Sequence, residues 1–207
     1  MEISRRAARE HAYVFASIGP AGRLLATGDP SEAELREVFT KQVESLTEAG
    51  PDALVIETLS DPGEANCAVW AAHASGLPVV AGMAFDSGKN KARTMMGTAP
   101  QEAAPILTAA VVIGANCGQG IEGHFGLYKG LVAGTGCPIW LKPNGGSPEL
   151  VGTETVYRTT PEAFAESASA LVNAGVAFIG GCCGTTPAFI ATPSRALHPK
   201  TQAIPCA

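Results

Sequence analysis

Three cysteines in two short clusters are the residues of this chain best suited to chemistry. Cys117 lies in the segment GANCG at 114–118, and Cys182 and Cys183 lie in GGCCGTTP at 180–187. Each cluster follows an apolar run typical of a buried strand. Zinc binds thiolates well, and a zinc site with three protein ligands keeps its fourth position for water or substrate. The three cysteines therefore predict one metal site that takes part in chemistry.

Cys182 and Cys183 can reach one ion only where the strand has ended, because neighbouring strand residues point to opposite faces. Gly180, Gly181 and Gly184 permit the backbone to bend there. Two other interpretations remain open. The cysteines could pack as small buried hydrophobic side chains, or Cys182 and Cys183 could form a disulfide with each other.

Composition limits the class of protein. The chain has 207 residues, 46% of them hydrophobic, and a net charge of −5, so one domain spanning 1–207 is expected. A mildly acidic chain without a basic stripe predicts no nucleic-acid partner. No run approaches the roughly 20 apolar residues of a membrane helix, which predicts no membrane insertion. Its six cysteines, without an apolar signal segment, predict the reducing cytoplasm.

Helical stretches alternate with short apolar runs along the chain. The clearest helix is predicted from Ser31 to Ala49, with Ser31 and Glu34 spaced as a capping box and Gly50 as its stop. Another is predicted to begin at Thr160-Pro161, because proline is favoured at the first helical position. The pattern indicates an α/β fold built from repeated units.

The apolar runs predict the strands Tyr13–Ser17, Ala53–Ile56, Pro78–Ala84, Ala109–Gly114, Ile139–Lys142 and Val176–Gly180. Nearly continuous apolar strands between helices favour a parallel sheet buried on both faces. Functional residues of such folds gather at the carboxyl ends of the strands. Those ends carry the polar candidates of this chain, which are Ser17, Glu57, Asn116, Cys117, Asn144, Cys182 and Cys183.

Five motifs follow one another along nearly the whole chain. They are ASIGP at 16–20, IET at 56–58, GANCG at 114–118, KPNGG at 142–146 and GCCGTTP at 181–187. In this combination the chain resembles the zinc-dependent homocysteine S-methyltransferase family. Residues 83–98 and 143–161 look closest to the homocysteine-binding domain of cobalamin-dependent methionine synthase. The resemblance implies a (β/α)8 TIM barrel.

The resemblance also implies roles for individual residues. Cys117, Cys182 and Cys183 match the three zinc ligands of the family, and Glu57 matches the carboxylate that holds the amino group of homocysteine. It implies Zn²⁺ as the cofactor and homocysteine as the thiol that becomes methionine. The methyl donor implied by the methionine synthase branch is methylcobalamin on a separate corrinoid domain or protein.

The four other polar candidates have two interpretations each. Glu57 could instead pair with a nearby lysine or arginine. Asn116 and Asn144 could orient metal ligands or substrate, although asparagine beside glycine or proline is also ordinary turn chemistry. Ser17 could shape the wall of the substrate pocket or simply precede a Gly-Pro turn.

The chemistry expected of such a site follows from charge. An alkyl thiol is mostly protonated near pH 7, whereas its thiolate is the nucleophile. Coordination to zinc would remove that proton and keep the sulfur ready to attack a methyl group. Two alternatives remain: a corrinoid-system methyltransferase with another thiol or methyl donor, and a non-catalytic zinc-binding subunit that docks to a corrinoid protein.

The chain departs from the family in its strand count. An eight-stranded barrel usually takes about 250 residues, and the family's opening strands have no counterpart before Ser17. The first residues look like the helix that follows the second strand. We therefore expect a barrel without its first two strands. Unpaired strand edges are normally covered, which favours a homo-oligomer or a complementing chain; a truncated form of the barrel is the third interpretation.

The remaining cysteines and one histidine are weaker candidates. His124 could close the metal site as a fourth ligand. Cys67 lies in a helical stretch and is expected to pack in the core. Cys137 precedes a strand, at the end opposite the site, and is expected to be structural. Cys206 lies in the C-terminal tail and supports no interpretation.

Overall fold

The main sheet of the protein is a curved array of parallel strands. The computed structural model describes residues 1–23, 25–28 and 30–197. Six strands pair in the order β1-β2-β3-β4-β5-β8, and all their pairings are parallel. Their bounds are β1 Phe15–Ile18, β2 Ala53–Leu59, β3 Val79–Met83, β4 Val112–Gly120, β5 Ile139–Asn144 and β8 Phe178–Ile179.

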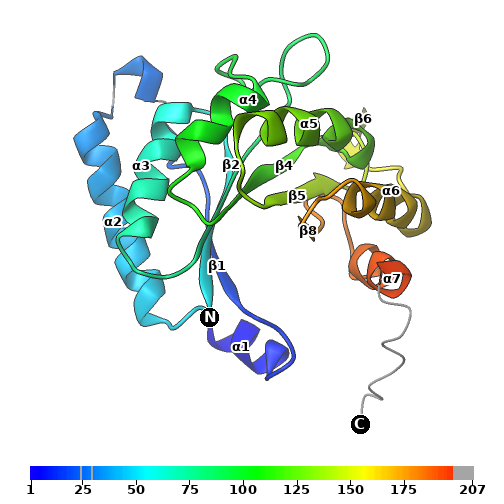
Figure 1. The fold of residues 1–207 in the computed structure, drawn as a ribbon, viewed down its shortest axis with the longest axis horizontal. Helices are drawn as coiled ribbons and strands as arrows, with labels where there is room; N and C mark the ends of the chain where they lie inside the picture. Colours follow the sequence, from blue (N-terminus) through cyan, green and yellow to red (C-terminus); the bar gives the residue numbers. More distant parts are fainter. Residues whose placement is uncertain (24, 29, 198–207) are drawn as a thin grey trace.

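The helices between successive strands lie along the outside of the curve (Figure 1). The α-helices are α1 Glu2–Ala8, α2 Glu32–Glu48, α3 Pro62–His73, α4 Pro100–Ala103, α5 His124–Gly134, α6 Pro161–Asn173 and α7 Ala188–Leu197. The 3-10 helices are η1 Leu25–Thr27, η2 Ala104–Leu107 and η3 Ile121–Gly123. A small antiparallel hairpin, β6 Glu149–Val151 and β7 Glu154–Val156, follows β5.

Both helix starts predicted from sequence are confirmed. The Glu34 backbone N–H donates to Ser31 Oγ, and the Ser31 N–H donates to Glu34 Oε2 at 2.9 Å, which completes the capping box of α2. At α6 the backbone N–H of Ala163 donates to Thr160 Oγ1, and Pro161 takes the first helical position. These caps satisfy amide groups that a helix leaves free in its first turn.

Alternation of side chains divides each strand between two faces. The outward residues, such as Ile18, Ile56 and Ile113, are fully buried against the helices and form the main core. The inward residues of the central strands form a second, smaller cluster of Val55, Val80, Val112 and Trp140. Because residues two apart share a face, the polar residues that continue these inward rows lie at the carboxyl ends of the strands.

The prediction of a barrel lacking two strands is confirmed as to architecture: six parallel strands curve with their helices outside. Several predicted strand bounds are wrong, among them the carboxyl ends of β2 and β4. The strand predicted to stop at Ile56 runs to Leu59, and the strand predicted to stop at Gly114 runs to Gly120. Each extension crosses an irregularity in strand register, which a sequence pattern of alternating or continuous apolar residues does not reveal.

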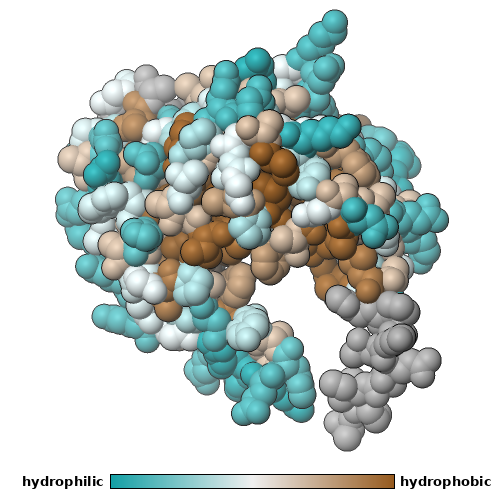
Figure 2. Space-filling view, in the orientation of Figure 1, coloured by the Kyte–Doolittle hydropathy of each residue, from teal (hydrophilic) through white to brown (hydrophobic). Residues whose placement is uncertain are grey.

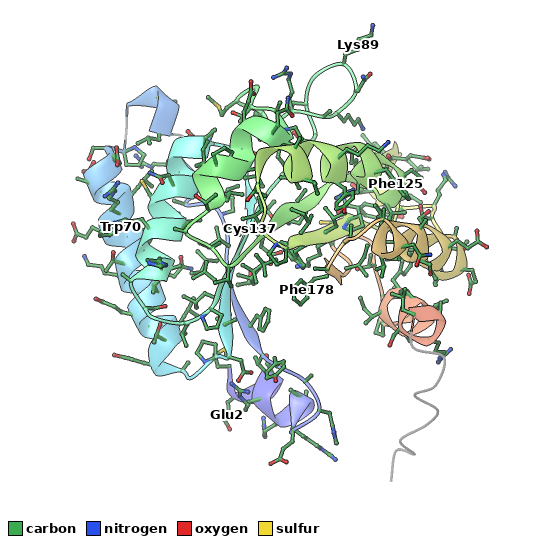
Figure 3. All side chains as sticks on the ribbon, viewed as in Figure 1. Glu2, Trp70, Lys89, Phe125, Cys137 and Phe178 are labelled. Atoms are coloured by element: carbon green, nitrogen blue, oxygen red, sulfur yellow. The ribbon has the colours of Figure 1, made fainter. Side chains whose placement is uncertain are left out.

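The two ends of the sheet are β1 and β8. Within the described residues, each pairs with another strand on one side only. Their inward residues Phe15 and Phe178 are 46% and 51% exposed. Hydrophobic side chains gather on the concave side in Figure 2, and Figure 3 shows Phe178 pointing into it. That the edges are covered by a second copy or a complementing chain stays a proposal.

None of the helices in the described part of the chain combines the length and the apolar character needed to cross a membrane.

Replacing Gly114 with alanine tests how closely β4 and β5 approach. A Cβ there would lie 1.8 Å from the backbone oxygen of Trp140, whereas a Cβ at Gly136 meets no atom within 4 Å. Forcing the strands apart should lower the free energy of unfolding by at least about 2 kcal/mol. Gly136→Ala is the matched control, expected to change it by less than about 1 kcal/mol. Equal effects in urea denaturation would contradict this packing.

Candidate functional site

The three cysteines predicted from the sequence meet at the carboxyl end of the sheet. The Sγ atoms of Cys117, Cys182 and Cys183 all lie within 4.8 Å of one another, and the Cys117 and Cys183 sulfurs are 3.7 Å apart. Tetrahedral zinc with Zn–S bonds of about 2.3 Å requires sulfurs separated by roughly 3.8 Å. The trio therefore fits a thiophilic ion with small side-chain adjustments.

The position of Cys117 depends on an irregular turn of the backbone inside β4. Cys117 has a φ of +60° and Gly118 a φ of +74°, and the register with β5 shifts between Asn116 and Gly120. Such bulges redirect side chains. A Cβ at Gly118 would lie 2.8 Å from the Phe85 carbonyl oxygen, so glycine is needed there. The bulge lets two consecutive residues, Asn116 and Cys117, both approach the cluster.

The loop that carries Cys182 and Cys183 is tied to the end of β5. Cys182 N–H donates to the Pro143 carbonyl at 2.8 Å, and Gly145 N–H donates to the Cys183 carbonyl at 2.9 Å. The buried Asn144 accepts a bond from the Cys183 N–H through its Oδ1, at 3.2 Å. Asn144 therefore positions the cysteine loop.

The thiols influence one another electrostatically. Hydrogen bonding from the Cys182 thiol lowers the pKa of Cys117 to about 7. The pKa of Cys182 is raised, first by the same hydrogen bond and then by burial. Full ionisation of three thiols this close would concentrate negative charge, which a bound cation would offset. All three are free thiols, and Cys183 is exposed, so neither a disulfide nor buried packing describes them.

Asn116 lies beneath the cysteines and is fully buried. Its Oδ1 accepts from the Thr58 N–H at 2.8 Å, and its Nδ2 donates to Thr58 Oγ1 at 2.8 Å. The same Nδ2 lies 3.9 Å from Cys182 Sγ. Thr58 has a φ of +68°, so the side chain of Asn116 holds a strained turn of β2 beside the cluster.

Glu57 carries the negative charge on the inward face of β2. Its Oε1 accepts a hydrogen bond from Ser17 Oγ at 2.6 Å, and its Oε2 accepts one from Lys142 Nζ at 2.6 Å. Ser17 is on β1 and Lys142 is on β5, so the three side chains meet across the concave side of the sheet. The alternative interpretation of Glu57, an ion pair with a nearby lysine, is thus confirmed.

His124 does not join the cysteine cluster. Among the described histidine, cysteine, aspartate and glutamate residues, the one group suited to a metal ion is the cysteine trio. His124 is buried at the start of α5, with Nδ1 3.1 Å from the Gly120 carbonyl oxygen and Nε2 without a hydrogen-bond partner. A fourth-ligand role for His124 is therefore wrong for this structure, because its ring packs in the core.

The other cysteines lie apart from the trio. Cys67 is fully buried in α3, as predicted. Cys137 lies at the amino end of β5, the end opposite the cysteine trio, also as predicted. Cys206 falls outside the described residues.

Sequence analysis missed two residues of the site, Lys142 and Thr58. Lys142 opens the KPNGG motif and shares the inward row of Trp140, so strand alternation could have placed it in the site. Thr58 gave no comparable signal, because its contact depends on the positive φ.

The family comparison decides the relationship. A family model described as homocysteine S-methyltransferase matches residues 1–197. The chain belongs to the homocysteine S-methyltransferase family. Methionine synthase of Mycobacterium tuberculosis is 29% identical over 202 residues, covering 91% of this chain and 17% of that protein. Homocysteine S-methyltransferase 4 of Zea mays is 27% identical over 211 residues, covering 94% of this chain and 61% of that protein.

Solved structures agree on the fold. The homocysteine methyltransferase MmuM of Escherichia coli in its apo form has a TM-score of 0.70 at 23% identity, covering 93% of this chain and 67% of that one. Its metallated form has a TM-score of 0.66 at 24% identity, covering 94% of this chain and 65% of that one. The chain thus spans about a sixth of the M. tuberculosis enzyme and about two thirds of the E. coli one.

The buried His124 should make stability depend on pH. Burial lowers its pKa to about 4, below the value of about 6.5 in an unfolded chain. The unfolded state therefore binds the extra proton first as pH falls. Stability contributed by the neutral ring is present above pH 6.5 and lost towards pH 4, by up to about 3 kcal/mol.

Urea denaturation of the wild type and of His124→Gln at several pH values between 7 and 4.5 measures this loss. Effects of other groups cancel in the difference between the two proteins. The wild type should lose stability more steeply on acidification. Parallel pH profiles would show that His124 does not titrate below its ordinary range.

Proposed function

We propose that this protein is a zinc-dependent methyltransferase that accepts homocysteine as its thiol and yields methionine. The observation that carries the proposal is the convergence of Cys117, Cys182 and Cys183 within 4.8 Å at the carboxyl end of the parallel strands. Family membership and the likeness to named homocysteine methyltransferases support it. The metallated form of the E. coli enzyme supports a metal in this fold.

The donor set fits zinc. Three cysteine sulfurs suit a thiophilic ion and leave one position for a substrate sulfur. When bound, zinc would supply a Lewis acid that keeps a substrate thiol deprotonated near neutral pH. Cys117, Cys182 and Cys183 would hold the ion. Asn116 and Asn144 would keep the cysteine loops in place through their hydrogen bonds.

The chain's own residues would position the rest of the substrate. The side chain of Glu57 is 13% exposed, and Ser17 donates a hydrogen bond to one of its carboxylate oxygens. An ammonium group of the substrate would bind there by a charge-assisted hydrogen bond. Holding the amino acid at Glu57 would direct its thiol towards the cysteines.

The methyl donor is proposed to be a methylcorrinoid carried by a separate domain or protein. The similarity to the M. tuberculosis methionine synthase supports this donor. The alternatives are another methyl donor or thiol, and a non-catalytic zinc-binding subunit that docks to a corrinoid protein. Reduced thiols require a reducing compartment, for which the cytoplasm is the proposal.

Replacing Cys117 with serine tests the proposed metal centre. Removal of one of three thiolates should lower bound zinc from about one per chain, and lower the rate of methionine formation from homocysteine and methylcobalamin by at least about a hundredfold. Cys137→Ser is the matched control and should leave both unchanged. Zinc is measured by inductively coupled plasma mass spectrometry, and methionine by mass spectrometry.

Each alternative has its own outcome in this experiment. Full zinc content and activity in Cys117→Ser would contradict the proposed centre. Methionine formed only from a donor other than methylcobalamin would favour the alternative enzyme. Zinc bound by the wild type without transfer from any donor would favour the non-catalytic subunit.

A further inference from the structure

Lys142 is a charged residue within the candidate site whose role the zinc chemistry does not require. It extends from β5 to β2, where its Nζ lies 2.6 Å from Glu57 Oε2. Strands β3 and β4 lie between β2 and β5. Gly82, an inward residue of β3, has no side chain in this space; a Cβ there would lie 2.8 Å from the Trp140 ring. The two charges of the pair therefore stand side by side on the concave face.

The pair retains hydrogen-bonding capacity on both charges. A lysine ammonium has three N–H donors and a carboxylate oxygen has two acceptor positions. In the described part of the chain, Lys142 Nζ donates one hydrogen bond, to Glu57. Its side chain is 28% exposed, so its other donors can reach a ligand. Glu57 likewise keeps acceptor positions beyond those used by Ser17 and Lys142.

Lys142 also lies next to the cysteine end of the site. It is the register partner of Asn116, whose Nδ2 lies 3.9 Å from Cys182 Sγ. A Cβ on Gly180, two residues before Cys182, would lie 3.7 Å from Lys142 Cγ. The Glu57–Lys142 pair is therefore close to the sulfurs, within reach of the other end of a small thiol.

We infer that Lys142 binds the carboxylate of the substrate, so that Glu57 and Lys142 together select thiols that carry the two opposite charges of an α-amino acid. This inference rests on the proposed function and adds to it the residue that binds the carboxylate of the substrate. The substrate ammonium binds Glu57 and its carboxylate binds Lys142 in a charge-assisted hydrogen bond. A neighbouring positive and negative charge matches a zwitterion and disfavours thiols that lack either group.

A binding experiment with three thiols separates the contributions of the substrate ammonium and carboxylate groups. L-Homocysteine has both groups, 3-aminopropane-1-thiol lacks the carboxylate, and 4-sulfanylbutanoate lacks the ammonium. Dissociation constants are measured by isothermal titration calorimetry on the zinc-loaded full chain. The variants are Lys142→Met and Lys142→Arg, with Lys129→Met as the matched control, because Lys129 is an exposed lysine on α5.

Wild-type protein should bind homocysteine at least about tenfold more tightly than 3-aminopropane-1-thiol, because the carboxylate adds a charged hydrogen bond. Lys142→Met should remove the preference for homocysteine over 3-aminopropane-1-thiol and should weaken the binding of 4-sulfanylbutanoate to a similar degree. Lys142→Arg should restore part of it, since the charge is kept. Lys129→Met should behave as wild type.

A preference that persists in Lys142→Met would overturn the inference. So would tighter binding of homocysteine by that variant, because Lys142 would then occupy the place of the substrate ammonium. Circular dichroism shows whether Lys142→Met is folded. Lys142→Arg tests the ratio of the dissociation constants of 3-aminopropane-1-thiol and homocysteine while the positive charge is retained. Wild-type protein that binds none of the three thiols would instead contradict the proposed function itself.

Discussion

The bulge at Cys117 is the constraint on which the arrangement of the site depends. Regular alternation would send Cys117 to the face opposite Asn116. The positive φ values of Cys117 and Gly118 let both residues approach the cluster, where Cys117 meets Cys183 at 3.7 Å. Asn116 links this bulge to the positive φ of Thr58 through two hydrogen bonds of 2.8 Å. Two irregular backbone turns on different strands therefore support one another, and a buried asparagine joins them.

The scaffold separates stability from chemistry. Outward residues of the strands pack against the helices in a continuous apolar core, whereas the carboxyl ends of the inward rows carry the charged and sulfur-bearing groups. Within this rim the three sulfurs meet at one place, and Lys142 and Glu57 form an ion pair near them. The parallel sheet brings residues distant in sequence to one edge, as is usual for barrels of this class.

Sequence patterns predicted the elements better than their local geometry. Apolar runs located all six strands, and capping residues located α2 and α6. The motifs carrying Cys117, Cys182 and Cys183 predicted that these sulfurs would meet. The ends of β2 and β4 could not be predicted, because a bulge depends on tertiary contacts such as that of Gly118 with the Phe85 carbonyl. Strand alternation with Trp140 could have placed Lys142 in the site, but its contact with Glu57 could not be predicted, because no sequence pattern shows that a side chain reaches from β5 to β2.

X-ray absorption at the zinc edge, with and without homocysteine, tests the central claim most directly. The sulfurs of Cys117, Cys182 and Cys183 are already close enough to share an ion. The account predicts three sulfur ligands at about 2.3 Å and one lighter ligand in the zinc-loaded protein. Addition of homocysteine should replace the lighter ligand with a fourth sulfur. A zinc site that already has four protein ligands, or one whose spectrum homocysteine leaves unchanged, would contradict an open thiolate centre.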